Sequence, residues 1–572
     1  MKKVLIDVSN GSIAIEPFDQ KKYGYLGGRG LVAKLLTEKH VPKCDPLGPE
    51  NPFLFVTGYF SGTALTTCNR LSLGTKSPLT GTIKESNVGG TFAKYMTEHS
   101  IKYIELLGVA QKGEFKVLVI DKDGSIRFDS ADDIVGLNNY DVGNALRFKY
   151  GDNISIASIG TVGEKYSLAA SVQVTEFQTN NPCRAAARGG IGAVFASKGL
   201  KAVVIVRPEK PYKVEVPSEF ADEFKACNKI VTKAIQENPL TGLQMNQFGS
   251  AAGIDVTGKM GALPTRNFSG KFSTRWEELS SPKWRERMLA QGGRGGIPCQ
   301  PGCIVRCSNE WYDKNGNYLS AGIEYETLGL CGPNIDIYDA DEIVALDRLC
   351  DDMGYDTIEV GNSLAVAMEM GVLDWGDAEG AKELVRASVT DECKVPEFRN
   401  GCYAVAKSLG ATRIPTAKKQ AVAAYDPRII LGYGLCFERS TMGGDHTSGS
   451  GLTFRKDLTP LEQAETALAQ TATCDSFMCL FPWAAVNFDM DARAAICRMA
   501  GCLAKDAEGP NMSLIESMGF EILRMEQKFN ELEGFTEDDN RLPNFFYIEP
   551  AEATGLPYTS HFDKHPIPDE EF

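Results

Sequence analysis

The sequence predicts an α+β protein in which a β-rich N-terminal domain precedes two mainly helical domains. Residues 1–208 hold short alternating apolar and polar runs separated by Asn-Gly, Lys-Gly and Asp-Gly turns, which is typical of strands. From about Val216 the apolar residues recur at helical spacing instead. Prolines mark boundaries near Arg207-Pro208 and Thr412–Pro415, so we expect domains at 1–208, 209–413 and 414–572.

Strands are expected at the very start of the chain and again after residue 100. Lys2–Val8 and Ser12–Pro17 flank an Asn-Gly pair, which predicts a hairpin. The alternation returns from Tyr103 to Phe128, and Ala202–Val206 is an apolar run typical of a buried strand. Gly30–Lys39 has helical spacing, so this domain is mixed rather than all-β.

Helices are expected through most of the remaining chain, with Ser218 as the N-cap of the first. The predicted helices are Ser218–Gln236, Asp339–Met353, Glu359–Met370, Glu397–Leu409, Pro460–Cys474, Asp491–Leu503 and Met512–Leu532. The stretch from Leu542 to Phe572 has five prolines and little periodicity, so we expect an extended arm over the surface.

Composition excludes several classes of protein. The 572 residues include 60 Lys and Arg against 75 Asp and Glu, a net charge of −15, which argues against nucleic-acid binding and would suit basic partners. No apolar run of about 18 residues predicts a membrane span, and the N-terminus lacks the apolar core of a signal peptide. Sixteen cysteines without these features indicate reduced thiols in a cytoplasmic protein.

Three cysteines lie together as C-x3-C-x3-C. Cys299, Cys303 and Cys307 stand in a stretch rich in glycine and proline, which predicts a loop where thiolates can converge. With a fourth ligand, Cys479 or Cys474, they could hold an iron–sulfur cluster. Three alternatives stay open: a structural zinc, a radical enzyme using S-adenosylmethionine, whose usual spacing is C-x3-C-x2-C, and three thiols that never meet.

Glycine-rich segments with arginines recur in the first domain. They are LGGRG from Leu26, KSPLTG from Lys76, SNVGG from Ser86 and RAAARGGIG from Arg184. None is a P-loop or a dinucleotide-binding fingerprint. Each alone is typical of a tight turn, but several together with arginines favour a site for an anionic cofactor, because backbone N–H groups can approach phosphates there.

Together these motifs resemble the aldehyde:ferredoxin oxidoreductase family, whose members carry tungsten or molybdenum between two pterin-dithiolenes. The likeness runs through nearly the whole chain. It includes the glycine-rich segments and the cysteine loop and, further along, the sequences EYETL from Glu324, CDDMGYDTIEVG from Cys350, AYDPR from Ala424, GGDH from Gly443 and CDSFMCLF from Cys474. The resemblance implies that the N-terminal domain cradles the cofactor.

The resemblance implies roles for particular residues. Cys299, Cys303, Cys307 and Cys479 match the ligands of one [4Fe–4S] cluster, and Arg70 matches an arginine between cluster and pterin. The backbone carbonyls of Asn87 and Ala185 match ligands of a magnesium ion that links the pterin phosphates. The neighbours of those phosphates match Gly89, Arg184, Ala187 and Arg188.

Two further motifs of the family each bind one pterin, and a carboxylate and an imidazole handle protons. The first pterin motif corresponds to Asp351, Tyr355 and Asp356, and the second to Asp475 and Met478. The proton-handling pair corresponds to Glu326 and His446. Read without the family, Glu326 could be a buried paired carboxylate and His446 a structural histidine. Glu324 and Glu326 lie on a strand-like segment, which predicts that both side chains share one face.

The sequence also departs from the family pattern. The cysteine loop has one residue more than usual in its first gap, so we expect it to bulge, and the first pterin motif has Tyr355 where leucine is usual. The second pterin motif is one residue short, so either Asp475 or Cys474 fills its place. Ala345 stands where some members bind a metal between subunits, which does not support a metal-bridged dimer.

The implied function is oxidation of an aldehyde to a carboxylic acid, with electrons leaving through the cluster to ferredoxin or to a multi-cluster iron–sulfur subunit. The alternatives are the catalytic subunit of an acyl-CoA ring-reducing complex of the same family and, in a different class, a non-catalytic metal-binding protein. Neither nucleic acid nor a membrane span is expected, and a higher-order oligomer stays open. The ligand sulfurs belong to the cofactor, so the sequence does not choose between tungsten and molybdenum.

Overall fold

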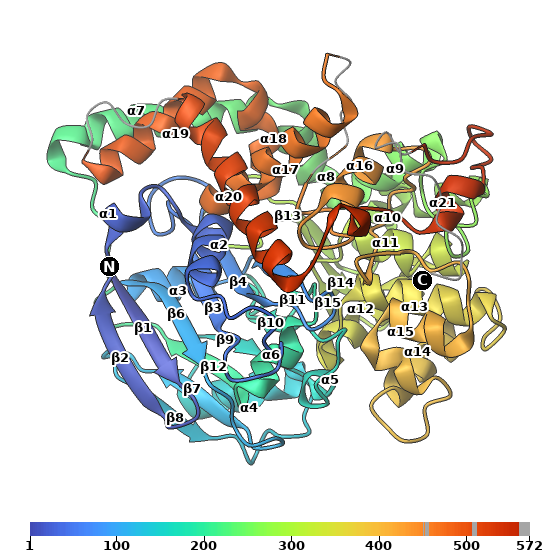
Figure 1. Ribbon diagram of the computed structural model, residues 1–572, viewed down its shortest axis with the longest axis horizontal. Coiled ribbons are helices and arrows are strands. Elements are labelled where there is room, and N and C mark those ends of the chain that lie inside the picture. The colour runs from blue at the N-terminus through green and yellow to red at the C-terminus, as the bar shows by residue number, and fades with distance from the viewer. Residues whose placement is uncertain (450, 452–456, 506–511, 560–572) are drawn as a thin grey trace.

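The computed structural model describes residues 1–449, 451, 457–505 and 512–559 (Figure 1). Its N-terminal part contains two six-stranded sheets, with strand orders β2-β1-β6-β3-β4-β5 and β11-β10-β9-β12-β7-β8. The first sheet comprises β1 (Lys2–Asp7), β2 (Ser12–Pro17), β3 (Phe53–Thr57), β4 (Leu71–Lys76), β5 (Ile83–Val88) and β6 (Ile101–Leu107). The second comprises β7 (Lys116–Ile120), β8 (Ile126–Ser130), β9 (Ile154–Ser158), β10 (Val172–Val174), β11 (Arg184–Ala186) and β12 (Leu200–Val206).

The two sheets enclose a shared apolar core. Phe53 and Phe55 of the first sheet contact the ring of Phe195 on helix α6, which also packs against the second sheet. Within the two sheets of residues 1–208, all of them described, only the β1–β6 and β7–β12 pairs are parallel, and the other strand pairs are antiparallel. The helices of this part are α1 (Gln20–Tyr23), α2 (Gly28–Glu38), α3 (Phe92–Glu98), α4 (Asn139–Tyr150), α5 (Thr161–Glu164) and α6 (Ile191–Ser197).

The middle of the chain is mainly helical, with one three-stranded sheet. Its helices and helical turns are η1 (Ser218–Phe220), α7 (Ala221–Glu237), η2 (Pro239–Gln244), α8 (Met245–Phe248), η3 (Gly249–Ala251), α9 (Ala252–Met260), η4 (Thr274–Leu279), α10 (Ser281–Ala290), α11 (Tyr325–Leu330), η5 (Pro333–Ile335), α12 (Ala340–Met353), α13 (Thr357–Glu369), α14 (Ala378–Ala387), η6 (Pro396–Asn400) and α15 (Cys402–Leu409). Its strands are β13 (Arg294–Ile297), β14 (Ser308–Tyr312) and β15 (Tyr318–Ala321).

The C-terminal part is also helical. After the two-stranded pair β16 (Thr416–Ala417) and β17 (Gln420–Ala421) come α16 (Leu431–Arg439), α17 (Pro460–Phe477), α18 (Leu480–Phe488), α19 (Met490–Ala504), α20 (Met512–Glu533), η7 (Glu537–Asp539) and α21 (Asn544–Ile548). No helix in the described part of the chain is long and apolar enough to cross a membrane.

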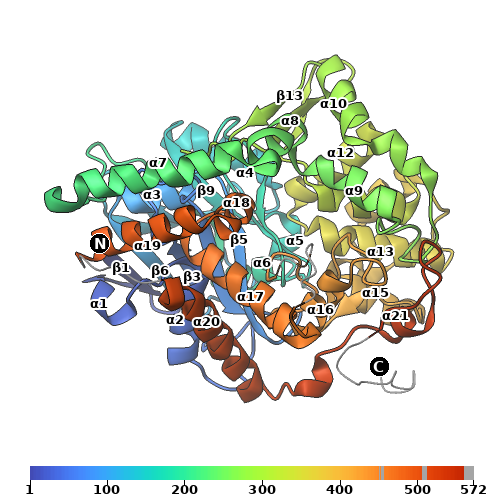
Figure 2. The same cartoon turned by 90° about the horizontal axis from the view of Figure 1, so that it is seen from above.

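The predicted α+β class is confirmed, while the domain limits at 208 and 413 stay predictions. Helix α7 belongs by sequence to the middle of the chain, yet it packs on α19 and α18 at the outside of the molecule (Figures 1 and 2). Its buried residues Phe224, Cys227, Val231 and Ile235 join an apolar cluster with α18, α19 and α20. This cluster also includes Leu35 and Leu36 of α2, so it ties the first and last parts of the chain together.

Four local expectations were wrong. Ser218 starts a 3-10 turn rather than capping α7, and the helix predicted at Glu397–Leu409 is interrupted at Gly401, whose φ is 86°. The segment around Glu326, expected to be a strand, forms helix α11, and only its N-cap residue Glu324 has an extended backbone. The C-terminal stretch is not simply a surface arm, since Phe546 and Tyr558 are buried in the core; residues 560–572 lie outside the described residues.

Candidate functional site

The four predicted ligand thiols lie together near the surface of the molecule. Cys299, Cys303 and Cys307 occupy the loop between β13 and β14, and Cys479 is the residue before α18. The Cys303 thiol donates to Cys299 and lowers the Cys299 pKa to about 6, while burial and then the charges of Glu324, Cys299 and Cys479 raise the pKa of Cys307. The thiols of Cys307 and Cys479 therefore interact electrostatically, although they are 172 positions apart in the sequence.

A short segment of the N-terminal domain, Thr66-Thr67, hydrogen-bonds both to the cysteine loop and to the backbone of Cys479. The Thr67 carbonyl accepts from the Cys479 backbone N–H at 3.1 Å and from Gln300 Nε2 at 3.3 Å, and Thr66 Oγ1 donates to the Gly302 carbonyl at 2.9 Å. Within the described residues, no group of three or more His, Cys, Asp or Glu is arranged to hold a single metal ion. Four thiols with arginines beside them nevertheless provide the donors that an iron–sulfur cluster takes.

Cys474, the alternative fourth ligand, points elsewhere. Its side chain is fully buried in the apolar cluster around α17, and its Sγ lies 3.6 Å from the Met478 carbonyl oxygen and 3.4 Å from that of Cys479. Met478 itself is buried in the same cluster. Cys479 is half-buried and interacts electrostatically with Cys299 and Arg70, whereas Cys474 interacts with Arg70 and Cys479.

Arg70 and Gly89 lie between the thiols and the predicted pterin region. Burial lowers the Arg70 pKa, but the charges of Cys479, Cys299 and Asp475 raise it more. Arg70 Nε also donates to Asn87 Oδ1 on the neighbouring strand β5. A side chain at Gly89 would place its Cβ 3.1 Å from Arg70 Nη1 and 3.3 Å from Cys299 Sγ, so glycine keeps this approach open.

The residues predicted to surround the pterin phosphates come from two strands that contact each other. Asn87 is on β5, at the edge of the first sheet. Ala185 is on β11, at the edge of the second sheet, and the two strands contact each other. Ala187, like both of these, is half-buried. Arg184 lies nearer the thiols: it donates to Ser308, and its Nη1 is 3.5 Å from the Glu324 carboxylate.

The first predicted pterin motif lies at the turn between α12 and α13. Asp351 is buried, and burial followed by the charge of Asp347 raises its pKa well above the usual range. The charges of Arg184 and Arg348 lower this pKa only in part. Tyr355 points away, with its hydroxyl 2.6 Å from Ser388 Oγ, and Asp356 caps α13 at Ile358 N and bonds Arg188 Nε at 3.2 Å.

The second predicted pterin motif contributes Asp475, which faces two arginines of the N-terminal domain. Its Oδ2 is 3.7 Å from Arg29 Nη1, and both Arg29 and Arg70 lower its pKa against a larger rise from burial. Arg29 also holds Glu526 in a bidentate pair at 2.8 and 2.9 Å. Gly28 allows this approach, because a Cβ there would lie 2.0 Å from the Asp475 carbonyl oxygen.

Glu326 and His446 face each other although 120 residues separate them. Glu326 Oε1 is 3.4 Å from His446 Nε2, and Glu326 Oε2 accepts from the Ala424 backbone N–H at 2.7 Å. Burial raises the Glu326 pKa, which His446 and the Ala424 N–H partly offset. Glu326 Oε1 and His446 Nδ1 are buried and have no hydrogen-bond partner within the described chain.

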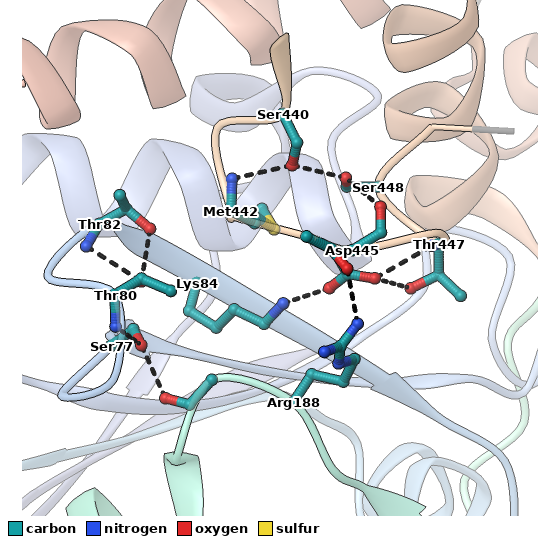
Figure 3. Close-up of polar contacts among 12 residues, drawn as sticks. Ser77, Thr80, Thr82, Lys84, Arg188, Ser440, Met442, Asp445, Thr447 and Ser448 are labelled. Carbon is teal, nitrogen blue, oxygen red and sulfur yellow. Dashed lines mark hydrogen bonds and ion pairs between the residues drawn. The ribbon is translucent and has the colours of Figure 1, made fainter. Parts of the chain in front are cut away.

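Two buried cations, Lys84 and Arg188, hold the loop that carries His446 (Figure 3). The sequence did not indicate this arrangement. Lys84 on β5 is paired with the Asp445 carboxylate, and Arg188 Nη1 donates to the Gly444 carbonyl at 2.8 Å. Thr447 supplies two further hydrogen bonds to Asp445 Oδ1, at 3.0 and 2.8 Å from its N and Oγ1. Lys84 and Arg188 hold the Asp445 pKa well below its usual range despite burial.

This clamp gives a first prediction. Replacing Lys84 with Met should leave Asp445 buried without its main partner, at a cost of about 3–5 kcal/mol. Asp445 has a depressed pKa in the folded state, so the pair's contribution is present above about pH 3.9, the ordinary Asp value, and is lost only as pH falls further. Lys84→Met should therefore lower the melting temperature by equal amounts at pH 5 and pH 8.

The control for the clamp is the double variant Lys84→Met/Asp445→Asn. Because it removes both charges, it should recover part of the lost melting temperature, and Lys84→Met alone should also lower turnover by displacing His446. Calorimetry of the purified protein measures the first effect. A single variant that melts like the unchanged protein would show that the pair does not hold this loop.

Comparison with known proteins identifies the class of this site. Family models match two stretches: "Aldehyde ferredoxin oxidoreductase, N-terminal domain" at residues 4–207, and "Aldehyde ferredoxin oxidoreductase, domains 2 & 3" at residues 225–564. The fold and these matches define an oxidoreductase. The chain belongs to the aldehyde ferredoxin oxidoreductase family, which confirms the resemblance found in the sequence.

Individual relatives agree with this placement. The chain is 30% identical over 466 residues to the tungsten-containing aldehyde ferredoxin oxidoreductase of Pyrococcus furiosus, covering 77% of this chain and 73% of the relative. It is 27% identical over 477 residues to the WOR-like subunit of an aliphatic sulfonate oxidoreductase from the same organism, covering 75% and 71%. Among solved structures, the active site complex BamBC of benzoyl coenzyme A reductase matches with a TM-score of 0.77 at 20% identity, over 95% and 90% of the chains; this likeness concerns the fold.

Proposed function

We propose that this chain oxidises aldehydes to carboxylic acids with tungsten, or molybdenum, held by two pterins. The overall change is RCHO + H2O to RCOOH + 2H⁺ + 2e⁻. The Glu326–His446 pair carries the proposal, because it offers two unpartnered proton-handling atoms in one place. The tungsten-containing relatives support the choice of metal.

The residues around this pair fit the cofactors. Asp351 and Asp475 would accept from the pterin N–H groups, since both are buried carboxylates whose charge lacks full compensation. The carbonyls of Asn87 and Ala185 would hold Mg²⁺, which prefers oxygen ligands. Gly89, Ala187 and Arg188 would border the phosphates. The bound metal supplies the two-electron redox chemistry.

The protein's own groups would handle the protons and position the substrate. His446 Nε2 or Nδ1 would donate a hydrogen bond to the aldehyde oxygen, and Glu326 Oε1 would take the proton from the water that adds to the carbonyl carbon. Tyr425 lies beside this pair, with its ring centroid 6.3 Å from that of His446, and stacks on Tyr433 at 4.0 Å.

The electrons would leave one at a time through a [4Fe–4S] cluster on Cys299, Cys303, Cys307 and Cys479. Arg70 interacts electrostatically with Cys299, Cys479 and Asp475, so it would border both cofactors. The acceptor would be ferredoxin or an iron–sulfur subunit, in line with the names of the relatives. Ala345 on α12 offers no ligand for a metal between subunits.

Metal analysis and an aldehyde assay on the purified protein test this proposal together. We expect about one tungsten or molybdenum and about four irons per chain, with viologen reduction that depends on an aldehyde. Protein that holds both metals but reduces only an aromatic acyl-CoA would favour the ring-reducing alternative instead. Protein that contains zinc alone would contradict both functions.

A further inference from the structure

Glu324 is a carboxylate that the proposed function does not use. It stands two residues before Glu326, at the N-cap of α11, and 39% of its side chain is exposed. The two glutamates have different partners: Glu326 faces His446, whereas Glu324 Oε1 lies 3.5 Å from Arg184 Nη1. Glu324 therefore lies outside the proton-handling pair.

A serine holds the Glu324 carboxylate beside the cysteine loop. Ser250 Oγ donates to Glu324 Oε2 at 2.5 Å and accepts from the Tyr325 backbone N–H at 2.9 Å. The residue before it, Gly249, approaches the loop so closely that a Cβ there would lie 2.6 Å from the Cys307 carbonyl oxygen. The backbone that carries Ser250 therefore packs against the third cysteine of the loop.

Arg184 also connects this carboxylate to the loop. Besides its approach to Glu324, it donates from Nη2 to the hydroxyl of Ser308, the residue that follows Cys307. A Cβ at Gly322 would lie 2.6 Å from Arg184 Cζ, so the guanidinium packs directly on the backbone just before Glu324. Arg184 is buried, with an exposed fraction of 7%. It therefore contacts both the carboxylate and the end of the cysteine loop.

The charges of Glu324 and Arg184 act on the thiols in opposite directions. Burial raises the pKa of Cys307, and among the charges around it Glu324 raises that pKa most, while Arg184 lowers it. The hydrogen bond with Cys303 lowers the pKa of Cys299; Arg184 lowers it further, whereas burial and Glu324 raise it. These directions agree with the contacts, since both place one anion and one cation beside the same two thiols.

A fixed charge beside an iron–sulfur cluster shifts the reduction potential of the cluster. Reduction adds one negative charge to the cluster, so a nearby carboxylate opposes reduction and lowers the potential, whereas a nearby cation raises it. Cys299 and Cys307 are buried, so salt and water screen this interaction less than they screen a surface pair. The partial exposure of Glu324 keeps the effect moderate.

We propose that the charge of Glu324, positioned by Ser250 and Arg184, lowers the reduction potential of the proposed [4Fe–4S] cluster. The inference rests on the proposed function, since it needs a cluster on the four thiols. A low potential lets the cluster pass each electron on to a low-potential acceptor. The proposal also assigns Arg184 to the surroundings of the cluster, whereas the family resemblance implied a place beside the pterin phosphates.

Redox titration followed by electron paramagnetic resonance tests this role without turnover. Glu324→Gln keeps an oxygen that can accept from Ser250 but removes the charge. It should favour the reduced cluster about tenfold, which is a rise of about 59 mV for one electron. Glu324→Asp, which retains the charge, should recover most of the original potential. Arg184→Met should shift the potential in the opposite direction, which a merely structural role of these residues would not produce.

The matched control is Glu383→Gln, which removes one exposed glutamate on α14 and so has the same net charge as Glu324→Gln. Its iron content and reduction potential should equal those of the unchanged protein. No shift in Glu324→Gln, or an equal shift in both variants, would overturn the role of Glu324. Unchanged protein that contains no reducible cluster would contradict the proposed function, and this role with it.

Two dyes of different potential provide a second readout. In Glu324→Gln, aldehyde-dependent reduction of methyl viologen should fall more than reduction of benzyl viologen, whose potential is higher. The reason is that an electron held at a higher potential passes less readily to a low-potential acceptor. Glu383→Gln should leave the ratio of the two rates unchanged. An equal fall with both dyes would show that Glu324 supports assembly or catalysis and does not set the potential.

Discussion

Replacing Cys303 with Ala should remove the iron of the cluster and abolish electron transfer to any one-electron acceptor. Cluster irons are held by thiolates, and alanine supplies no substitute ligand. Cys303 is the thiol that hydrogen-bonds Cys299, so its loss also removes the contact that organises the loop. Iron content, and the electron paramagnetic resonance signal after reduction, measure the effect.

Cys44→Ala provides the control for this substitution. Cys44 is half-buried in the N-terminal domain, near Lys76 and Glu533, and is not among the four predicted ligands. It should keep about four irons per chain and full turnover. If the Cys303 variant kept those irons as well, Cys303 would not be a ligand, and Cys474 would return as a candidate.

Replacing Glu326 with Gln should lower turnover by about 10²–10⁴-fold, the usual loss when a general acid or base is removed. Metal and pterin content should not change, because Gln keeps the size of the side chain and can still accept from the Ala424 N–H. His446→Ala should have an effect of similar size. Turnover and metal content, measured on the same preparation, separate catalysis from assembly.

The pH profile checks the role of Glu326 independently. As a base, Glu326 acts only when deprotonated, and burial raises its pKa. Turnover of the unchanged protein should therefore rise with pH through a limb above the ordinary glutamate value of about 4.3, and this limb should vanish in Glu326→Gln. Glu438→Gln is the control, since that buried carboxylate accepts from Tyr558 at 3.0 Å instead. Unchanged turnover in Glu326→Gln would remove the residue from the mechanism.

Local patterns predicted most of the fold but not the contacts that cross the chain. The helices α7, α12, α13 and α19 follow the periodicity of their own residues, and the β1–β2 hairpin follows its Asn-Gly turn. The segment at Glu326 misled, because two glutamates at alternate positions fit a strand as well as a helix N-terminus. Short patterns of this kind do not contain the tertiary contact that decides between them.

The candidate site likewise contains residues that the sequence could identify and residues that it could not. Residues with a motif, such as the four cysteines, could be named from the sequence by resemblance. Lys84 and Arg29 could not, since each owes its role to an acidic partner far along the chain: Asp445 for Lys84, and Glu526 for Arg29. A buried lysine carries no local signal, and only the arrangement of β5 against the loop at 443–448 reveals it.

The pairing of Arg29 with Glu526 also has a consequence for how the protein is made. Ribosomes release the N-terminal sheets first, but Arg29 meets its carboxylate only after 497 further residues have been synthesised, and Cys479 emerges long after the other thiols. Until then the side of α2 that carries Arg29 stays uncovered, because α17 and α20 pack on it, and the four thiols come together only after Cys479 has been synthesised. The proposed cluster could accordingly be loaded only at that stage, and products truncated before Cys479 should contain no iron.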